Sequence, residues 1–318
     1  MQCYIPVAPG QYVPPVWDHV QVDGLLLVAD VMARVGERRA GEFLANIPAD
    51  LVTMCDSGAY RLLSQGTKLN PENILAIQRS CGAPLNVQLD WPITARSPLR
   101  EIELHRRRTL ETARLWLEEF GPDHTVVVVH GRNASELDAA LAGLCNLERD
   151  FGELKHLALG SVARISRTSP LRVAELAAHC LRHRPHANWH IFGVGATTAV
   201  LLATIGIHSV DSSSHIMDAS FGLARHPITL APHKVAGSNS DECDIPNVCN
   251  CPVCRNSPGD LARPGREGVG ARAIHNIWLL QRMVRERRVP ARYVRALSTV
   301  QAWRGQSTLD DVLGLGGV

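Results

Sequence analysis

Three acidic residues that follow short apolar runs are the side chains in this sequence best suited to chemistry. They are Asp56, Asp90 and Asp211. Carboxylates grouped around one site suit reactions through an oxocarbenium-like sugar, in which one attacks or stabilises the anomeric carbon and another carries the leaving group's proton. An aspartate at a strand end is also a common helix cap, and Asp56 with Ser57 fits that simpler role.

Glycine and polar residues end the other apolar runs. These positions are His130–Gly131, Gly160–Ser161 and the segment 193–195. Glycine lets a backbone approach a ligand closely, so the main chain at Gly131, Gly160 and Ser161 is suited to reading a purine edge. Tyr60, four residues after Asp56, offers a flat ring for stacking, and packing at the rim explains it equally well. We therefore predict a site for a sugar and a base.

A second cluster of reactive side chains lies towards the C-terminal end. Cys249, Cys251 and Cys254 form C-x-C-x-x-C on a turn-prone loop, and His275 follows after twenty residues in a segment with helical character. Three thiols and one imidazole complete a closed tetrahedral zinc site. We expect a structural Zn²⁺, because no position is left for water. The other six cysteines are scattered, which favours a reducing cytoplasm over a disulfide framework.

The pattern of apolar runs indicates which elements hold these residues. Candidate strands are 24–30, 51–56, 84–90, 125–130, 156–160, 189–195 and 207–211, with a weak eighth at 227–230. Helical periodicity separates them at 71–79, 98–120, 134–147, 171–181 and 197–205. This alternation predicts an α/β fold, a (β/α)₈ barrel forming a single catalytic domain over 1–318, with a zinc subdomain (241–280) inserted before the last helix. The strand ends of such a barrel face one mouth, where the three aspartates would converge.

Composition narrows the function class. Apolar residues make up 45% and charged residues 20%, which is typical of a globular protein. The N-terminus does not resemble a signal peptide, and no apolar run reaches the roughly 18 residues of a membrane span. No P-loop, G-x-G-x-x-G after a strand or HExxH motif occurs. Arginine clusters at 100 and 106–108 and at 282–295 fit either solvated helix faces or contact with nucleic acid.

Six segments together resemble the tRNA-guanine transglycosylase superfamily, in the family's order from about residue 50 to 280. Asp56-Ser-Gly-Ala-Tyr60 resembles D-S-G-G-[FY], and Asp90 in Gln-Leu-Asp-Trp-Pro resembles the aspartate that reads the guanine edge. The remaining segments are Val129-His-Gly131 (family V-Q-G), Leu159-Gly-Ser-Val162 (L-G-G-[LV]), Phe192-Gly-Val-Gly195 (M-G-V-G) and Asp211-Ser-Ser-Ser214, which carries the family's nucleophile. The C-x-C-x-x-C…H zinc site completes the resemblance.

The resemblance implies base exchange without ATP. Asp211 would attack C1′ of a guanosine nucleotide and Asp56 would act as general acid/base. The base-binding residues would be Asp90, Tyr60, Ser57, His130, Gly131, Gly160 and Ser161. Guanine would leave and a 7-deazaguanine such as preQ0 would enter. A homodimer is also expected, because family members often pair near the zinc subdomain.

Departures from the family pattern favour DNA as the substrate, with tRNA as the alternative. The segment after Asp211 is hardly basic, whereas bacterial tRNA enzymes carry a basic segment there, and no appended RNA-binding domain of the archaeal kind follows. His130 replaces a glutamine and Ser161 replaces a glycine. Two other readings are a catalytically inactive partner subunit, which retention of Asp211 argues against, and a retaining glycoside hydrolase, which would have more aromatic residues than the 5% here.

Overall fold

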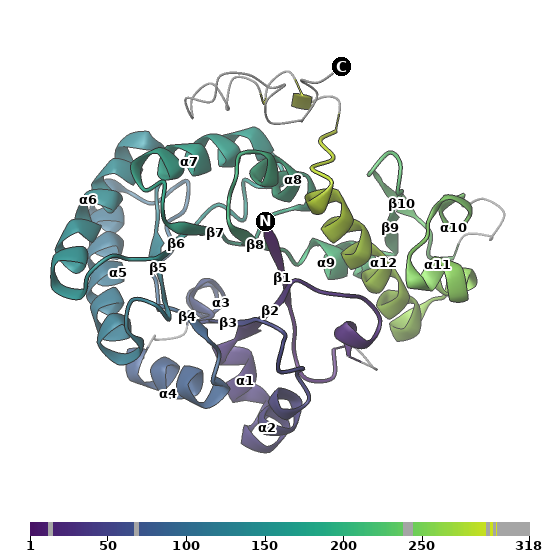
Figure 1. Cartoon of the computed structure of the whole chain (residues 1–318), viewed down its shortest axis with the longest axis horizontal. Helices are drawn as coiled ribbons and strands as arrows, with labels where there is room; N and C mark the ends of the chain where they lie inside the picture. Colours follow the sequence, from purple (N-terminus) through teal and green to yellow (C-terminus); the bar gives the residue numbers. More distant parts are fainter. Residues whose placement is uncertain (12–14, 67–69, 238–243, 291–292, 295–296, 298–318) are drawn as a thin grey trace.

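Eight parallel strands close into a barrel with helices around it (Figure 1). The computed structural model describes residues 1–11, 15–66, 70–237, 244–290, 293–294 and 297. The barrel strands are β1 (Gln2–Pro6), β2 (Gly24–Val28), β3 (Thr53–Asp56), β4 (Leu85–Val87), β5 (Thr125–Val129), β6 (His156–Leu159), β7 (Asn188–Ile191) and β8 (Ser209–Asp211). The predicted (β/α)₈ barrel is confirmed.

The predicted eighth strand is wrong. Residues 227–230 form a turn in which the Leu230 amide donates to the carbonyl of His226 at 2.8 Å and Leu230 takes a φ of 63°. Pro227 has no amide hydrogen, which disfavours it in a strand paired on both sides. The barrel is instead closed by the N-terminal β1, which pairs with β2 on one side and with β8 on the other, where Tyr4 lies opposite Asp211.

In chain order the helices are α1 (Ala29–Val35), α2 (Glu37–Ala45), α3 (Ala59–Ser64), α4 (Pro71–Cys81), α5 (Leu99–Phe120), α6 (Ala134–Phe151), α7 (Pro170–His183), α8 (Ala196–Thr204), α9 (Ser214–Ser220), α10 (Ile245–Val248), α11 (Pro252–Asn256) and α12 (Gly265–Arg285). The five predicted helical segments correspond to α4, α5, α6, α7 and α8 to within a few residues. The side chains of Asn70 and Asn133 cap α4 and α6 by accepting backbone amides of the first turn, which explains why those helices begin where they do.

Alternation along the strands produces two apolar layers. Tyr4, Leu26, Met54 and Val126 belong to a cluster drawn from successive barrel strands. Their strand neighbours pack in the larger core that includes residues of the surrounding helices. Because successive strand residues point to opposite faces, the first cluster fills the barrel interior and fixes the strand ends that carry the polar residues.

The cysteine-rich segment lies between the last barrel strand and α12. A short hairpin of β9 (Leu223–Arg225) and β10 (Pro232–Lys234) follows α9, and then come α10, α11 and a 3-10 turn at Pro258–Leu261. In Figure 1 this segment stands outside the helical ring, beside α12. The helix α12 packs closely against α9, so it joins the cysteine-rich segment to the barrel.

Candidate active site

The three aspartates occupy the carboxyl ends of strands on one mouth of the barrel. Asp56 ends β3, Asp211 ends β8, and Asp90 follows β4 by three residues. The pKa of Asp56 is raised from 3.8 to about 8, first by burial and then by the negative charges of Asp90 and Asp211. The amide of Gly58 donates to Asp56 Oδ2 at 3.2 Å and offsets part of this effect. Asp56 therefore keeps its proton at neutral pH beside two other carboxyl groups.

One oxygen of Asp211 is held in place. The Gly193 amide donates to Oδ1 at 2.8 Å, and His190 Nε2 lies 3.3 Å from the same oxygen. Gly193 has a φ of 64°, and a Cβ there would come within 2.7 Å of the Ala163 side chain, so glycine is needed at this position. Among the described residues no hydrogen bond involves Oδ2, so one oxygen is positioned by the protein and the other is not.

His190 is a site residue that sequence reasoning missed. It lies in β7, is buried, and its Nδ1 lies 2.9 Å from Ser209 Oγ while its ring packs edge-on to Phe192. When the Ser209 hydroxyl donates its hydrogen bond to Nδ1, the proton of the neutral imidazole lies on Nε2, which faces Asp211. The available signal was a polar residue between the apolar Trp189 and Ile191, two positions before the Phe192-Gly-Val-Gly segment.

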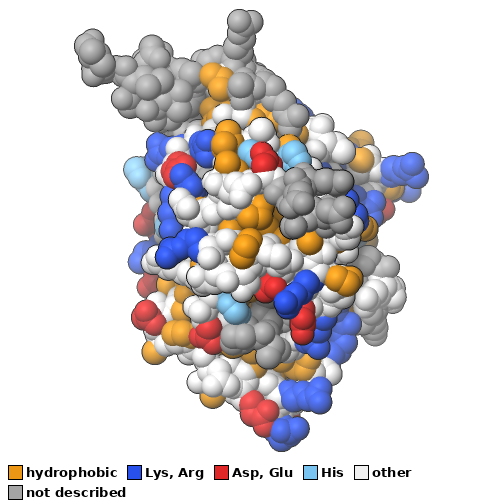
Figure 2. Space-filling view, turned by 90° about the vertical axis from the view of Figure 1, so that its right-hand side faces the viewer, with side chains coloured by type: hydrophobic (Ala, Val, Ile, Leu, Met, Phe, Trp, Pro, Cys, Tyr) orange, Lys and Arg blue, Asp and Glu red, His pale blue; other side chains and the backbone are white. Residues whose placement is uncertain are grey.

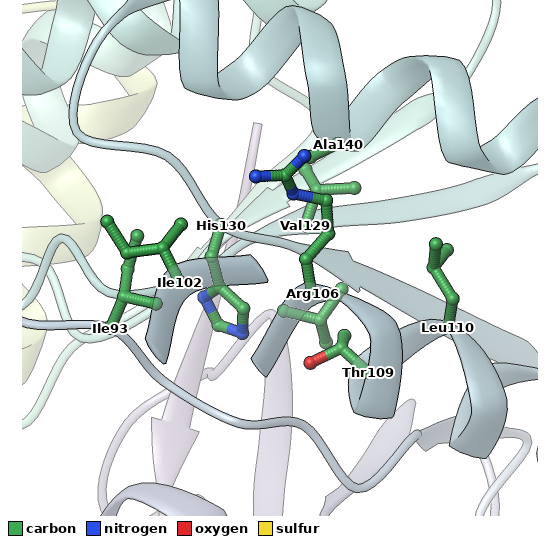
Figure 3. A pocket seen from close by; sticks show the side chains of 9 residues that line it. Ile93, Ile102, Arg106, Thr109, Leu110, Val129, His130 and Ala140 are labelled. Carbon is green, nitrogen blue, oxygen red and sulfur yellow. The ribbon is translucent and has the colours of Figure 1, made fainter. Parts of the chain in front are cut away.

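Asp90, His130 and Ser161 come together from three separate segments. Nε2 of His130 lies 2.9 Å from Asp90 Oδ2, and Nδ1 lies 2.9 Å from Ser161 Oγ. A Cβ on Gly160 would lie 2.4 Å from His130 Cε1, so only glycine leaves room for this ring. Figure 3 shows His130 among Ile93 and Ile102 beside α5, where a cavity of about 10 Å³ has room for about one water molecule.

The remaining predicted base-binding residues differ in their surroundings. Tyr60 is half exposed on α3, and its hydroxyl accepts a hydrogen bond from Arg164 Nε at 3.0 Å. Ser57 is fully buried, and its hydroxyl has no hydrogen-bond partner in the part of the chain that the structure describes. Gly131 packs against Leu137, where a Cβ would approach Cγ to 2.7 Å, so local packing also explains that glycine.

The four predicted metal ligands form one buried cluster. Nδ1 of His275 lies 3.6, 3.3 and 3.5 Å from the sulfurs of Cys249, Cys251 and Cys254. Zn–S of about 2.3 Å and Zn–N of about 2.0 Å in a tetrahedron require N···S separations of about 3.5 Å. The other ring nitrogen of His275 donates to the Arg225 carbonyl at 2.8 Å, which leaves Nδ1 free to coordinate. This group could therefore bind a metal ion.

A second candidate metal-binding group lies on the surface. Asp138 Oδ1 is 2.7 Å from His179 Nε2 and 3.2 Å from His183 Nε2, across α6 and α7. However, the Arg182 guanidinium lies 3.1 Å from His179 Nδ1 and can only donate. In the neutral ring the proton is therefore on Nε2, where it bonds Asp138. The cluster is therefore a hydrogen-bonded contact between α6 and α7.

Three arginines of the 282–295 cluster are engaged in local contacts. Arg285 pairs with Asp23 at 2.9 Å, and Arg282 pairs with Glu286 at 2.7 Å. Arg288 donates to the Pro227 carbonyl. Two further members, at 292 and 295, lie outside the described residues. Figure 2 shows the side of the molecule with the cysteine-rich segment, where basic and acidic side chains are interspersed.

Comparison with known proteins gives one family match. The family model described as queuine tRNA-ribosyltransferase (TGT) matches residues 46–300, which include every predicted site residue. No curated protein matches the chain in a direct sequence search. Within the described part of the chain, no helix has both the length and the apolarity to cross a membrane.

Proposed function

Because the chain belongs to the TGT family of guanine-exchanging pentosyltransferases, we propose that it replaces guanine in DNA with a 7-deazaguanine such as preQ0. Two carboxyl groups at one mouth of the barrel carry the proposed chemistry: Asp211 is held through one oxygen, and Asp56, whose pKa is raised to about 8, is protonated at neutral pH. These are the two states that a nucleophile and a general acid need.

In the proposed first step, Asp211 Oδ2 forms a bond to C1′ of the target nucleotide while the C1′–N9 bond breaks. The electron pair of that bond goes to guanine, and Asp56 donates its proton to the departing base. The Gly193 amide and His190 orient Asp211 through Oδ1. The product of this step is a covalent glycosyl-enzyme and free guanine.

The second step reverses the first with a different base. A 7-deazaguanine enters, gives its N9 proton to Asp56 and attacks C1′, which releases Asp211. Asp90 would hold the amide edge of either base, with His130, Ser161 and Gly160 around it, while Tyr60 would stack on the ring. Ser57 and the Gly131 backbone complete the proposed base-binding set.

We also infer that the Cys₃His group holds zinc and that the zinc is structural. Its four donors fill a tetrahedron, so the ion supplies folding energy and takes no part in the exchange. The segment 241–280 would then be a zinc subdomain within a single catalytic domain.

The segment after the nucleophile supports DNA over tRNA. Ser212, Ser214 and His215 are buried, and Ser212 Oγ donates to the Val194 carbonyl at 2.6 Å. Asp218, farther along, is paired with Arg225 at 2.6 Å. These side chains are therefore buried or paired within the protein, and they do not form a basic surface of the kind that binds an anticodon loop. The target base must leave its stack in a duplex or come from single-stranded DNA.

A labelling experiment separates the two substrates. Purified protein is incubated with radiolabelled guanine and either plasmid DNA or bulk tRNA, and the label in each polymer is counted. We expect label in DNA, and none with the Asp211→Asn variant. Label in tRNA alone would overturn the DNA assignment and leave base exchange intact. Nucleoside mass spectrometry of DNA from cells with and without the gene would then identify the inserted base.

A further inference from the structure

Two of the positions at which this chain departs from the motifs it resembles are in direct contact. His130 stands where the family has glutamine and Ser161 where it has glycine, and Ser161 Oγ lies 2.9 Å from His130 Nδ1. A glutamine amide offers both a donor and an acceptor, whereas each nitrogen of a neutral imidazole offers only one. What His130 presents to a ligand therefore depends on which nitrogen carries the proton.

The surroundings of Ser161 decide the position of that proton. The Ile93 amide donates to Ser161 Oγ at 2.9 Å, so the serine hydroxyl hydrogen is free to point at His130 Nδ1. With Nδ1 accepting, the proton of the neutral ring lies on Nε2. The opposite tautomer would place the Nε2 lone pair close to the negative charge of Asp90, whose Oδ2 is 2.9 Å away, and would leave the serine hydroxyl hydrogen without a partner.

The Nε2–H group remains available to a ligand. His130 is 7% exposed, and Nε2 has no hydrogen-bond partner among the described residues, although Asp90 Oδ2 is near. The contact with Asp90 is therefore electrostatic, with the N–H directed away from the line to the oxygen. A buried donor without a partner is costly, so an acceptor on a bound base would relieve it.

The backbone at Ser161 argues that its hydroxyl is functional. Ser161 has a φ of 63°, a left-handed conformation that glycine adopts freely and that costs other residues about 1 kcal/mol. Glycine would remove that cost but also the hydroxyl. The neighbouring Gly160 supplies the room for the imidazole ring. The two residues together hold the ring in one place and one orientation.

We propose that Ser161 is a positioning residue that fixes His130 in its Nε2–H form. His130 and Asp90 then present one donor beside one acceptor, which complements a base with a carbonyl next to a ring N–H. Guanine and 7-deazaguanines have that edge; adenine has the reverse pattern and is excluded. This inference rests on the proposed function, because it assumes that the site binds a base.

The first test determines which ring nitrogen of His130 carries the proton, and it needs no nucleic acid. Protein labelled with ¹⁵N-histidine is examined by NMR at a pH where the ring is neutral, and the His130 signals are assigned by their loss in His130→Gln. We expect a protonated Nε2 and an unprotonated Nδ1 in the parent, and a tautomer mixture in Ser161→Gly. A protonated Nδ1 in the parent protein would overturn the proposal.

The second test measures equilibrium binding of free guanine and adenine. Ser161→Gly and Ser161→Ala should each weaken guanine binding about tenfold, the value of one lost hydrogen bond. Ser161→Ala should be less thermally stable than Ser161→Gly, because the left-handed backbone at this position is unfavourable for alanine and not for glycine. Adding His130→Gln to Ser161→Gly should restore guanine binding, since the amide needs no partner to fix its donor.

Matched controls separate this inference from the proposed function. Ser80→Ala removes an exposed hydroxyl that bonds the Ile77 carbonyl within α4, and it should leave guanine binding unchanged. Unaltered guanine affinity in Ser161→Gly, or no recovery in the double variant, would refute the role of Ser161. If no DNA is labelled but the tautomer and guanine binding behave as expected, only the proposed substrate is wrong.

Discussion

Asp56 offers a sharp test of the site, because its proton links pH to stability. In the unfolded chain this carboxyl ionises near 3.8, whereas in the folded protein its pKa is about 8. Between these values the folded state holds one proton more than the unfolded state. Raising the pH through this window therefore destabilises the fold by about 1.4 kcal/mol per pH unit, and the effect ends above pH 8, where both states are ionised.

The comparison that isolates Asp56 uses the Asp56→Asn variant, which has no proton to lose at this position. The free energy of unfolding is measured by chemical denaturation at pH 5, 6 and 7 for both proteins, so that the other titrating groups cancel. The parent should lose about 3 kcal/mol more than the variant between pH 5 and pH 7. Parallel curves over this range would refute the raised pKa and with it the acid role of Asp56.

The same reasoning gives two further expectations. Exchange should fall as the pH rises through about 8, because Asp56 then loses the proton that the departing guanine needs. In Asp211→Asn one of the neighbouring negative charges is gone, so the pKa of Asp56 should fall. The pH at which the stability difference levels off should move down with it.

Four other substitutions test the rest of the site. Asp211→Asn should lower exchange by about 10³-fold or more and abolish the covalent adduct seen by mass spectrometry, while the fold and the metal content are unchanged. Exchange retained in this variant would show that Asp211 is not the nucleophile. His190→Phe should lower kcat about tenfold, and an unchanged kcat would mean that its contact with Asp211 is idle. Cys251→Ser should lower metal content and thermal stability together, and a stable but inactive variant would make the metal catalytic. Gly160→Ala, whose Cβ would lie 2.4 Å from His130 Cε1, should weaken guanine binding; equal affinity would place His130 away from the base.

Residues that are close in sequence made part of this protein predictable. Cys249, Cys251 and Cys254 lie within six residues, and the helix carrying His275 follows soon after, so the buried Cys₃His cluster could be predicted from spacing. The apolar runs and helical periods were equally local signals, and each predicted helix was confirmed to within a few residues. Because the parallel strand ends of a closed barrel share one mouth, the convergence of Asp56, Asp90 and Asp211 also followed from their positions.

Other features depend on contacts between segments that are far apart. Nothing local distinguishes the five-residue strand β1 from a loose N-terminus, and it becomes a barrel strand only by pairing with β2 and β8. His190 reads as one more core residue until the fold brings its Nε2 to Asp211. The protonation of Asp56 and the proposed tautomer of His130 likewise depend on burial and on neighbours from distant segments. The sequence by itself determined which side chains are available for chemistry, and only the tertiary structure decided their protonation and partners, because electrostatic and hydrogen-bond effects depend on distance in space.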